Sequence, residues 1–225
     1  RRHTRFRNVT GVQTCALPIY PVKQLTTGEG GAVTTNDPAF ARRLRQFRNH
    51  GIDTTARDRQ AAATWVWKYD MTELGYNYRL SDIGAALGLS QLRRFTATIE
   101  RRRAIADRYT RELAGVPMLR LPVVGEHVEP AWHLYPVRVR RPLSRDVIGN
   151  ALRMEGAGVV VHYPPVHLHS YYRTRFGFAE GDFPNAERAA EELITLPLFP
   201  AMTDRDIGNV ITAVRKVFDY FASEV

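Results

Sequence analysis

The chain has 225 residues, a formal net charge of +9 and an apolar content of 44%. This length allows one large domain or two small ones, and no apolar run approaches the roughly 20 residues that a membrane helix needs. The basic balance raises the question of nucleic-acid binding. The arginines are scattered, however, and their two clusters, at 101–103 and at 138–141, are more simply explained as a solvated helix face and a strand edge. We therefore expect neither a nucleic-acid nor a membrane partner.

Residues 1–19 are predicted to be an artefact rather than natural protein. The run from Val9 to Ile19 equals the peptide that one reading frame of a common DNA-sequencing adapter encodes, so we leave the segment out of the fold reasoning. A short basic leader is the alternative. The one cysteine, Cys15, falls in this segment, so we infer no disulfide or cysteine metal site. A body without cysteine suits the cytoplasm.

Lys23 lies in the first chemically informative segment, Tyr20-Pro-Val-Lys-Gln-Leu-Thr-Thr-Gly-Glu-Gly-Gly31. The chain has three lysines among its 32 basic residues, yet it keeps one directly before a glycine-rich turn. A lysine amine can lose its proton and attack a carbonyl, whereas a guanidinium stays protonated. The amine can then form a Schiff base with an aldehyde cofactor and shuttle a proton. A surface lysine before an ordinary turn is the alternative.

The following elements are read from turn residues and apolar spacing. Residues 31–35 are predicted to form a strand, and Asn36 or Asp37 to cap a helix through about Phe47. Residues 53–64 are predicted to be a polar surface loop. From Ser81 one long helical periodicity continues to Leu113 before a Gly-x-Pro stop.

Two glycines in this helical stretch, Gly84 and Gly88, allow close packing or a bend. The segment just before it reads Gly75-Tyr-Asn-Tyr-Arg79. An amide and a guanidinium ahead of a helix can hold a phosphate through directional hydrogen bonds. Taken alone, the segment is a turn with packed tyrosines.

The second half of the chain alternates between short strands and helices. We predict strands at 133–139 and 159–163, an extended run at 195–200, and helices at 144–155, 184–193 and about 203–222. We place a domain boundary in the helix near 95–117. Residues 20–110 are then the remnant of a large domain with a linking helix, and 111–225 a small α/β domain.

Three histidines, His162, His167 and His169, lie within eight residues and raise the question of a metal site. The alternation and the neighbouring prolines argue against a helical ligand face, and no nearby carboxylate completes a ligand set. We therefore expect no metal there, and we expect His169 to be simply exposed.

These segments together resemble the DegT-type (DegT/DnrJ/StrS) sugar aminotransferases, over Tyr20 to about Phe221. The lysine string is similar to the family's cofactor-lysine loop, and residues 75–92 to its Gly-Tyr-Asn-Tyr-Arg signature with the following helix. The resemblance implies an α/β chain with the type I fold of PLP-dependent aminotransferases, here a truncated large domain plus a small C-terminal domain. It also implies a homodimer with shared active sites.

The resemblance assigns roles to individual residues. Lys23 would be the catalytic residue that carries pyridoxal 5'-phosphate (PLP) as a Schiff base, and Asn77 would reach the PLP phosphate of the neighbouring subunit. Arg79 would line the same shared site. The nucleotide-sugar pocket would be formed by four residues, Tyr78, His162, Tyr163 and His167. Glu187 we assign mainly to packing and loop rigidity.

The resemblance also implies a reaction, in which glutamate donates an amino group to C4 of a UDP-linked 4-keto-6-deoxy sugar for cell-surface glycans. Residues 65–91 and 162–173 resemble the transaminase of the pseudaminic acid pathway, and perosamine-type and 4-amino-arabinose-type enzymes are alternatives. The family's acidic partner for the pyridinium nitrogen precedes its lysine and is missing here, so we expect this chain alone to be inactive. A non-catalytic dimer-forming or nucleotide-sugar-binding protein is the competing interpretation, although retention of Lys23 favours the enzyme.

Overall fold

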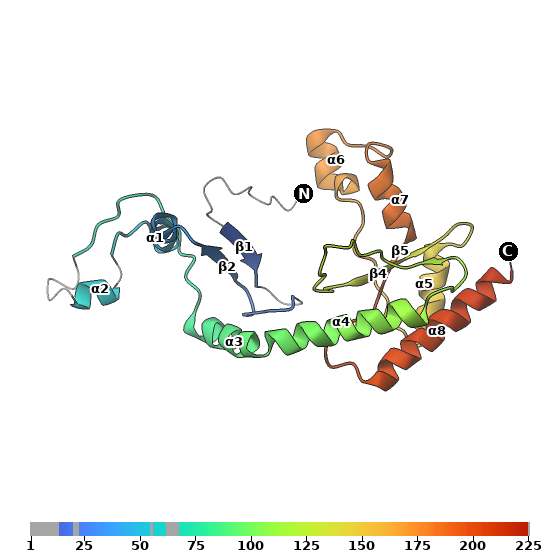
Figure 1. The fold of residues 1–225 in the computed structure, drawn as a ribbon. Coiled ribbons are helices and arrows are strands. Elements are labelled where there is room, and N and C mark those ends of the chain that lie inside the picture. The colour runs from blue at the N-terminus through green and yellow to red at the C-terminus, as the bar shows by residue number, and fades with distance from the viewer. Residues whose placement is uncertain (1–13, 20–22, 55, 62–67, 225) are drawn as a thin grey trace. The chain divides into compact units, whose positions relative to one another are not determined.

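The computed structural model describes residues 14–19, 23–54, 56–61 and 68–224. Its contacts divide the chain into two units, Arg1–Phe95 and Thr96–Val225, and each is described by itself (Figure 1). We expected residues 20–110 and 111–225 to be the two parts. The contact division falls earlier, at the start of the helix we assigned to the first part. That helix buries Ile105, Ala106 and Tyr109 in the core of the second unit.

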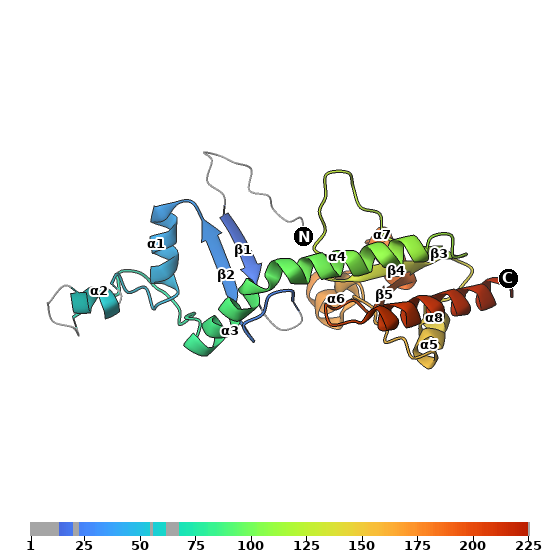
Figure 2. The same ribbon diagram turned by 60° about the horizontal axis from the view of Figure 1, so that its bottom comes forward.

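The first unit contains a two-stranded antiparallel sheet, β1 (Thr14–Pro18) and β2 (Gly31–Thr35), in which Thr14 pairs with Thr35 (Figure 2). Its helices are α1 (Pro38–Phe47), α2 (Ala56–Ala61) and α3 (Asp82–Arg93). The predicted strand β2 and helix α1 are confirmed. The Asp37 carboxylate caps α1 by accepting from the backbone N–H groups of Ala39 and Phe40. Strand β1 lies in the segment that we predict to be an artefact, which stays a prediction.

Helix α2 corrects one expectation, because residues 56–61 are helical where we predicted an irregular loop. Its segment, Ala-Arg-Asp-Arg-Gln-Ala, contains good helix formers. The Arg59 guanidinium also donates to the carbonyl of Thr54 at 3.1 Å, which ties the helix to the preceding chain.

The first unit builds little core from its own described residues. Among these residues Ile19 is the one large apolar side chain that is buried, at 8% exposure. Large apolar side chains are instead exposed along α3 and the segment before it, including Leu74, Ile83, Leu89 and Leu92. Burial of apolar surface is the main source of stability. The described residues of this unit therefore contribute little to its free energy of folding.

The second unit has a three-stranded antiparallel sheet in the order β3-β4-β5, with helices packed around it. Its elements in chain order are α4 (Phe95–Glu112), β3 (Leu119–Arg120), β4 (Tyr135–Val139), α5 (Arg145–Met154), the 3-10 helix η1 (Val166–Leu168), α6 (Ser170–Phe176), α7 (Pro184–Glu192), β5 (Leu193–Leu196) and α8 (Asp204–Ala222). Within the described ranges, no helix is both long and apolar enough to cross a membrane.

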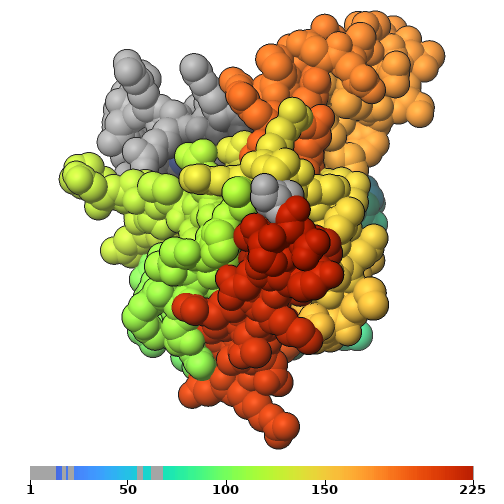
Figure 3. All heavy atoms as spheres, turned by 90° about the vertical axis from the view of Figure 1, so that its right-hand side faces the viewer, coloured from blue at the N-terminus to red at the C-terminus, as the bar shows by residue number. Residues whose placement is uncertain are grey.

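The core of the second unit lies between one face of this sheet and the helices α4, α5 and α8. Strand β4 alternates as a half-buried strand should, with Tyr135, Val137 and Val139 directed into the core. The Tyr135 ring packs on the Tyr109 ring of α4 at 5.2 Å, and burial raises the pKa of both phenols. Helix α8 buries seven of its residues. Figure 3 shows α8 in red beside α4 in green.

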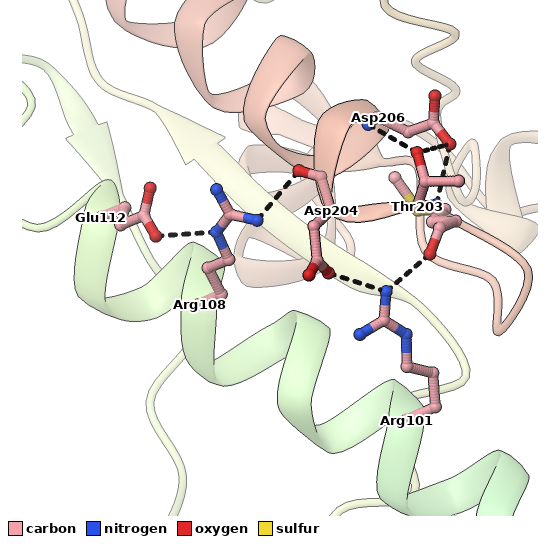
Figure 4. A network of polar contacts seen from close by, with 7 residues as sticks. Arg101, Arg108, Glu112, Thr203, Asp204 and Asp206 are labelled. Atoms are coloured by element: carbon pink, nitrogen blue, oxygen red, sulfur yellow. Dashed lines mark hydrogen bonds and ion pairs between the residues drawn. The ribbon is translucent and has the colours of Figure 1, made fainter.

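Two arginines of α4 hold the beginning of α8 (Figure 4). Arg101 donates to the Met202 carbonyl and the Asp204 carboxylate, at 2.6 and 3.0 Å. Arg108 donates to the Asp204 carbonyl at 2.9 Å. A capping box of Thr203 and Asp206 begins α8, and hydrogen bonds from the Thr203 hydroxyl and N–H lower the pKa of the Asp206 carboxyl.

Two further expectations differ from the structure. The single helical run from Ser81 to Leu113 is two helices, because the chain leaves helical geometry at Arg94. The strand predicted at 159–163 is wrong: Val160 forms one isolated bridge with Thr195, and Tyr163 is 65% exposed. The physical reason is the Pro-Pro pair at 164 and 165, which has no N–H to extend a ladder.

Candidate active site

The loop that carries Lys23 closes on the end of β1. The Ile19 N–H donates to the Gly30 carbonyl at 2.9 Å, and the Thr27 N–H donates to the Ile19 carbonyl at 3.1 Å. The hydroxyl of Thr27, a residue only 7% exposed, lies within hydrogen-bonding distance of the carbonyl oxygens of Ile19 and Glu29. Lys23 itself is partly buried. These bonds give a definite shape to the turn that follows the lysine.

Helix α3 packs directly against this loop through its two glycines. A Cβ atom at Gly88 would lie 2.8 Å from Cγ2 of Thr27, and one at Gly84 would lie 3.2 Å from the Thr27 carbonyl oxygen. The glycines therefore serve close packing rather than a bend. They bring the lysine loop against the helix that follows the Gly-Tyr-Asn-Tyr-Arg segment.

This contact predicts that Gly88→Ala disturbs the lysine loop. The added methyl overlaps Thr27, and overpacking of this kind costs about 1–3 kcal/mol. In Thr27→Ser the clashing methyl is absent, so the double variant Gly88→Ala/Thr27→Ser should recover most of the loss. Hydrogen exchange of residues 23–31 in the 225-residue chain is the measurement.

Gly149→Ala provides the matched control, because a Cβ at that helical glycine meets only Ile194 at 3.7 Å. That variant should stabilise α5 by about 0.5–1 kcal/mol. Unchanged exchange of residues 23–31 in Gly88→Ala would contradict the proposed packing.

The Gly-Tyr-Asn-Tyr-Arg segment is held by the end of α1 and the chain that follows it. The N–H of Tyr76 donates to the Phe47 carbonyl at 2.7 Å, and the N–H of Tyr78 donates to the Arg48 carbonyl at 2.9 Å. The Arg79 guanidinium donates to the Asn49 side chain at 2.7 Å. Asn49 is a residue that the sequence did not single out, since an Asn after a helix is ordinarily a turn residue.

Two tyrosine rings in this segment stack on each other, and the two candidate phosphate-binding side chains are exposed to solvent. The Tyr76 and Tyr78 rings lie 4.9 Å apart with an interplanar angle of 10°. Asn77 and Arg79 are both exposed, and Tyr78 is 66% exposed. The exposed Asn77 amide, and the guanidinium N–H groups of Arg79 that do not bind Asn49, are able to donate to a phosphate.

The histidines of the second unit occupy different environments. Nδ1 of His162 lies 2.9 Å from the hydroxyl of Thr195 on β5, a partner that the sequence did not indicate. His162 is partly buried, and His169 is exposed. His167 is 8% exposed, and its Nε2 lies 2.8 Å from the Glu187 carboxylate. Among the described residues, no three His, Cys, Asp or Glu side chains gather as a metal would require.

Glu187 organises the loop before α7. Its carboxylate accepts from the N–H groups of Gly181 and Phe183, at distances of 2.9–3.1 Å, as well as facing His167. The Gly181 hydrogen bond, with smaller contributions from His167 and Phe183, lowers the pKa of the Glu187 carboxyl. His167 therefore has a structural partner in this unit, whereas Tyr163 faces open solvent.

The structure thus brings the lysine loop, α3 and the Asn77–Arg79 segment into one unit, and the histidine segment into the other. The donor set of the first unit fits PLP. It contains an amine for the aldehyde, and an amide and a guanidinium that would donate to the phosphate of a neighbouring subunit's cofactor. An added Cβ at Gly30, beside the lysine loop, would clash with Thr27. The roles of Lys23, Asn77 and Arg79 toward the cofactor remain predictions.

Residues 9–215 match the DegT/DnrJ/EryC1/StrS aminotransferase family. The spore coat polysaccharide biosynthesis protein SpsC of Bacillus subtilis is 39% identical over 206 residues, which is 90% of this chain and 53% of SpsC. Spr1654 of Streptococcus pneumoniae, solved in PLP and PMP forms, superimposes in its PMP form with a TM-score of 0.81 at 30% identity. That match covers 92% of this chain and 53% of Spr1654.

Helicobacter pylori PseC, an aminotransferase involved in the biosynthesis of pseudoaminic acid, superimposes with a TM-score of 0.80 at 27% identity. The match covers 92% of this chain and 54% of PseC. The chain therefore spans about half the length of the relatives it matches, and over that half it has their mixed helix and strand fold. Aminotransferases of this family depend on PLP. Since the match extends over most of its residues, the chain belongs to the DegT/DnrJ/EryC1/StrS aminotransferase family.

Proposed function

We propose that this chain is the lysine-bearing part of a PLP-dependent nucleotide-sugar aminotransferase. The observation that carries the proposal is the packing of the lysine loop on α3, which sets Thr27 against Gly84 and Gly88 in a chain of this family. A binding protein without catalysis has no need of a lysine at this position. When bound, PLP supplies an aldehyde for amines and a ring that accepts electrons.

Each residue of the site has a proposed task. The Lys23 amine holds the cofactor and, when free, moves a proton at the substrate carbon. Asn77 and Arg79 donate hydrogen bonds to the cofactor phosphate of a neighbouring subunit in a homodimer. Their exposure within this unit supports that assignment. Tyr78, His162, Tyr163 and His167 are proposed for the sugar pocket, although the Glu187 contact gives His167 a positioning role first.

The proposed substrates are glutamate and a UDP-linked 4-keto-6-deoxy sugar aminated at C4, in the cytoplasm. Similarity to PseC supports the pseudaminic acid type, and similarity to SpsC supports a role in polysaccharide biosynthesis. Perosamine-type and 4-amino-arabinose-type reactions remain the alternatives. We further propose that the 225-residue chain alone is inactive, because the large apolar side chains on α3 are exposed in the unit that carries Lys23.

The test is a half-reaction in the protein from the uninterrupted reading frame, by which we mean this chain with the gene's own sequence upstream of Tyr20. Glutamate should convert its bound PLP to the amine form, which removes the visible absorption band, and the UDP-4-keto sugar should restore the band. A dTDP- or GDP-linked keto-sugar that restores it faster would change the proposed sugar class. Binding of the sugar without any conversion by glutamate would instead favour a non-catalytic binding protein. The 225-residue chain tested in parallel should show no turnover.

A further inference from the structure

The second unit has a cavity rich in arginine on the sheet face away from its core. The cavity has a volume of about 900 Å³ and lies between strands β3 and β4 and helix α7. Five arginines line it, Arg120, Arg138, Arg140, Arg141 and Arg188, together with one carboxylate, Glu192. We expected the arginines at 138–141 to lie at a solvated strand edge. Arg140 and Arg141 are exposed, as expected, but together with Arg138 they also line a concave site.

The placement of these charges works against the stability of the strands. Arg120 pairs directly with Arg138 in the β3–β4 register, and like charges directly opposite each other destabilise a sheet. Arg140 lies one residue beyond the end of β4, two residues after Arg138, and lines the same cavity. Three guanidinium groups therefore share one small area of the sheet, where an apolar or mixed-charge pattern would be more stable.

The protein neutralises these charges only in part. The Arg138 guanidinium pairs with the Glu192 carboxylate at 2.6 Å, and Arg141 pairs with Glu191 at 2.9 Å. Arg188 donates to the Asn185 side chain at 2.6 Å. Within the part of the chain that the structure describes, the guanidinium groups of Arg120 and Arg140 have no hydrogen-bonding or ion-pair partner. The groove thus keeps positive charge that internal carboxylates do not balance.

We propose that this groove, defined by the five arginines, binds a small ligand with two adjacent phosphate groups, such as a nucleoside diphosphate. Planar guanidinium groups bind phosphate through paired hydrogen bonds, and Arg120 and Arg140 are available for them. The volume lies in the range of about 300–1,000 Å³ that small-molecule sites occupy. A single concave site fits such a ligand better than a nucleic acid, which needs a basic stripe along the surface. The inference does not depend on the proposed transamination.

The test is calorimetric titration of the 225-residue chain with inorganic pyrophosphate, with UDP and with uridine. Pyrophosphate and UDP should bind and uridine should not, and binding should weaken from about 0.05 M to about 0.5 M salt. Arg120→Gln and Arg140→Gln should each weaken pyrophosphate binding about tenfold. Both side chains are exposed and unpartnered among the described residues, so neither variant should disturb folding. The matched control is Arg175→Gln, an exposed arginine outside the groove, which should bind as the unchanged chain does.

A second variant has an effect of opposite sign. Glu192→Gln removes the carboxylate that competes for Arg138, while its amide oxygen can still accept the same hydrogen bond. Pyrophosphate should therefore bind to Glu192→Gln more tightly than to the control variant Glu126→Gln. Glu126 is exposed and lies outside the groove. Pyrophosphate binding that is absent, or that Arg120→Gln and Arg140→Gln leave unchanged, overturns the proposal. So does an oligonucleotide that binds in a groove-dependent way while pyrophosphate does not.

Discussion

Replacing Lys23 by alanine should abolish covalent PLP attachment and transamination in the protein from the uninterrupted reading frame. The Lys23 amine is the group that we propose to bond the cofactor aldehyde. It is also the group that we propose to move the substrate proton, and the second role alone is worth about 10²–10⁴-fold in rate. Lys23→Arg should fail as well, because a guanidinium does not lose its proton at neutral pH. The measurement is borohydride reduction followed by peptide mapping, alongside the glutamate half-reaction.

The two other lysines provide matched controls for this experiment. The Lys216 side chain is 65% exposed and pairs with Glu155 at 2.8 Å, in the second unit. Lys68 is also exposed. Lys68→Ala and Lys216→Ala should retain the visible band and the activity. A reduced pyridoxyl label on either of these residues, with Lys23 unlabelled, would refute the assignment. Retention of the visible band in Lys23→Ala would do the same.

Replacing Arg102 by alanine should produce the largest loss of stability among the arginines of α4. Arg102 is 7% exposed, and burial lowers the pKa of its guanidinium. Its Nη1 donates to the carbonyl oxygens of Trp132, His133 and Leu198, at 3.0, 3.3 and 3.1 Å. These bonds tie α4 to the chain before β4 and after β5. Without the donor the carbonyls lose their partner, which together with the lost packing costs about 2–4 kcal/mol.

The neighbouring arginine is the matched control. Arg103 pairs with Glu129 at 3.0 Å, but both side chains are exposed, and an exposed ion pair contributes about 0–1 kcal/mol. Urea denaturation of Arg102→Ala and Arg103→Ala, followed by circular dichroism, compares the two free energies of unfolding at a common slope. Equal losses in the two variants would mean that the buried carbonyl contacts contribute nothing beyond a surface charge.

Sequence reasoning succeeded where neighbouring residues decide the structure. Asp37, one of the two residues predicted to cap α1, does so, and α8 begins close to the predicted residue 203. Such helix starts are predictable because a cap needs only the residues of the first turn. The family was also recognisable from residues 20–31 and 75–92. Their unusual order carries the identity of the site without any knowledge of its neighbours.

Sequence reasoning failed where distant segments decide the structure. We assigned the three arginines at 101–103 to a solvated face, yet successive residues of a helix point about 100° apart. Arg102 shares its face with Ile105, Ala106 and Tyr109 of α4. That spacing of three, four and seven residues was a usable signal. The partners of Arg102 lie as many as 96 residues away in the chain. The sequence alone therefore did not reveal which carbonyl oxygens accept its hydrogen bonds.

The same division applies to the candidate site. The sequence by itself determined which groups are present: an amine before a glycine turn, an amide and a guanidinium before a helix, and closely spaced arginines at 138–141. Only the tertiary structure decided three contacts. Thr27 packs on Gly88, the Glu187 carboxylate contacts the His167 ring, and Arg120 lies opposite Arg138. Local propensity depends on a few adjacent residues, whereas burial and charge pairing depend on strand register and helix packing between segments far apart in the chain.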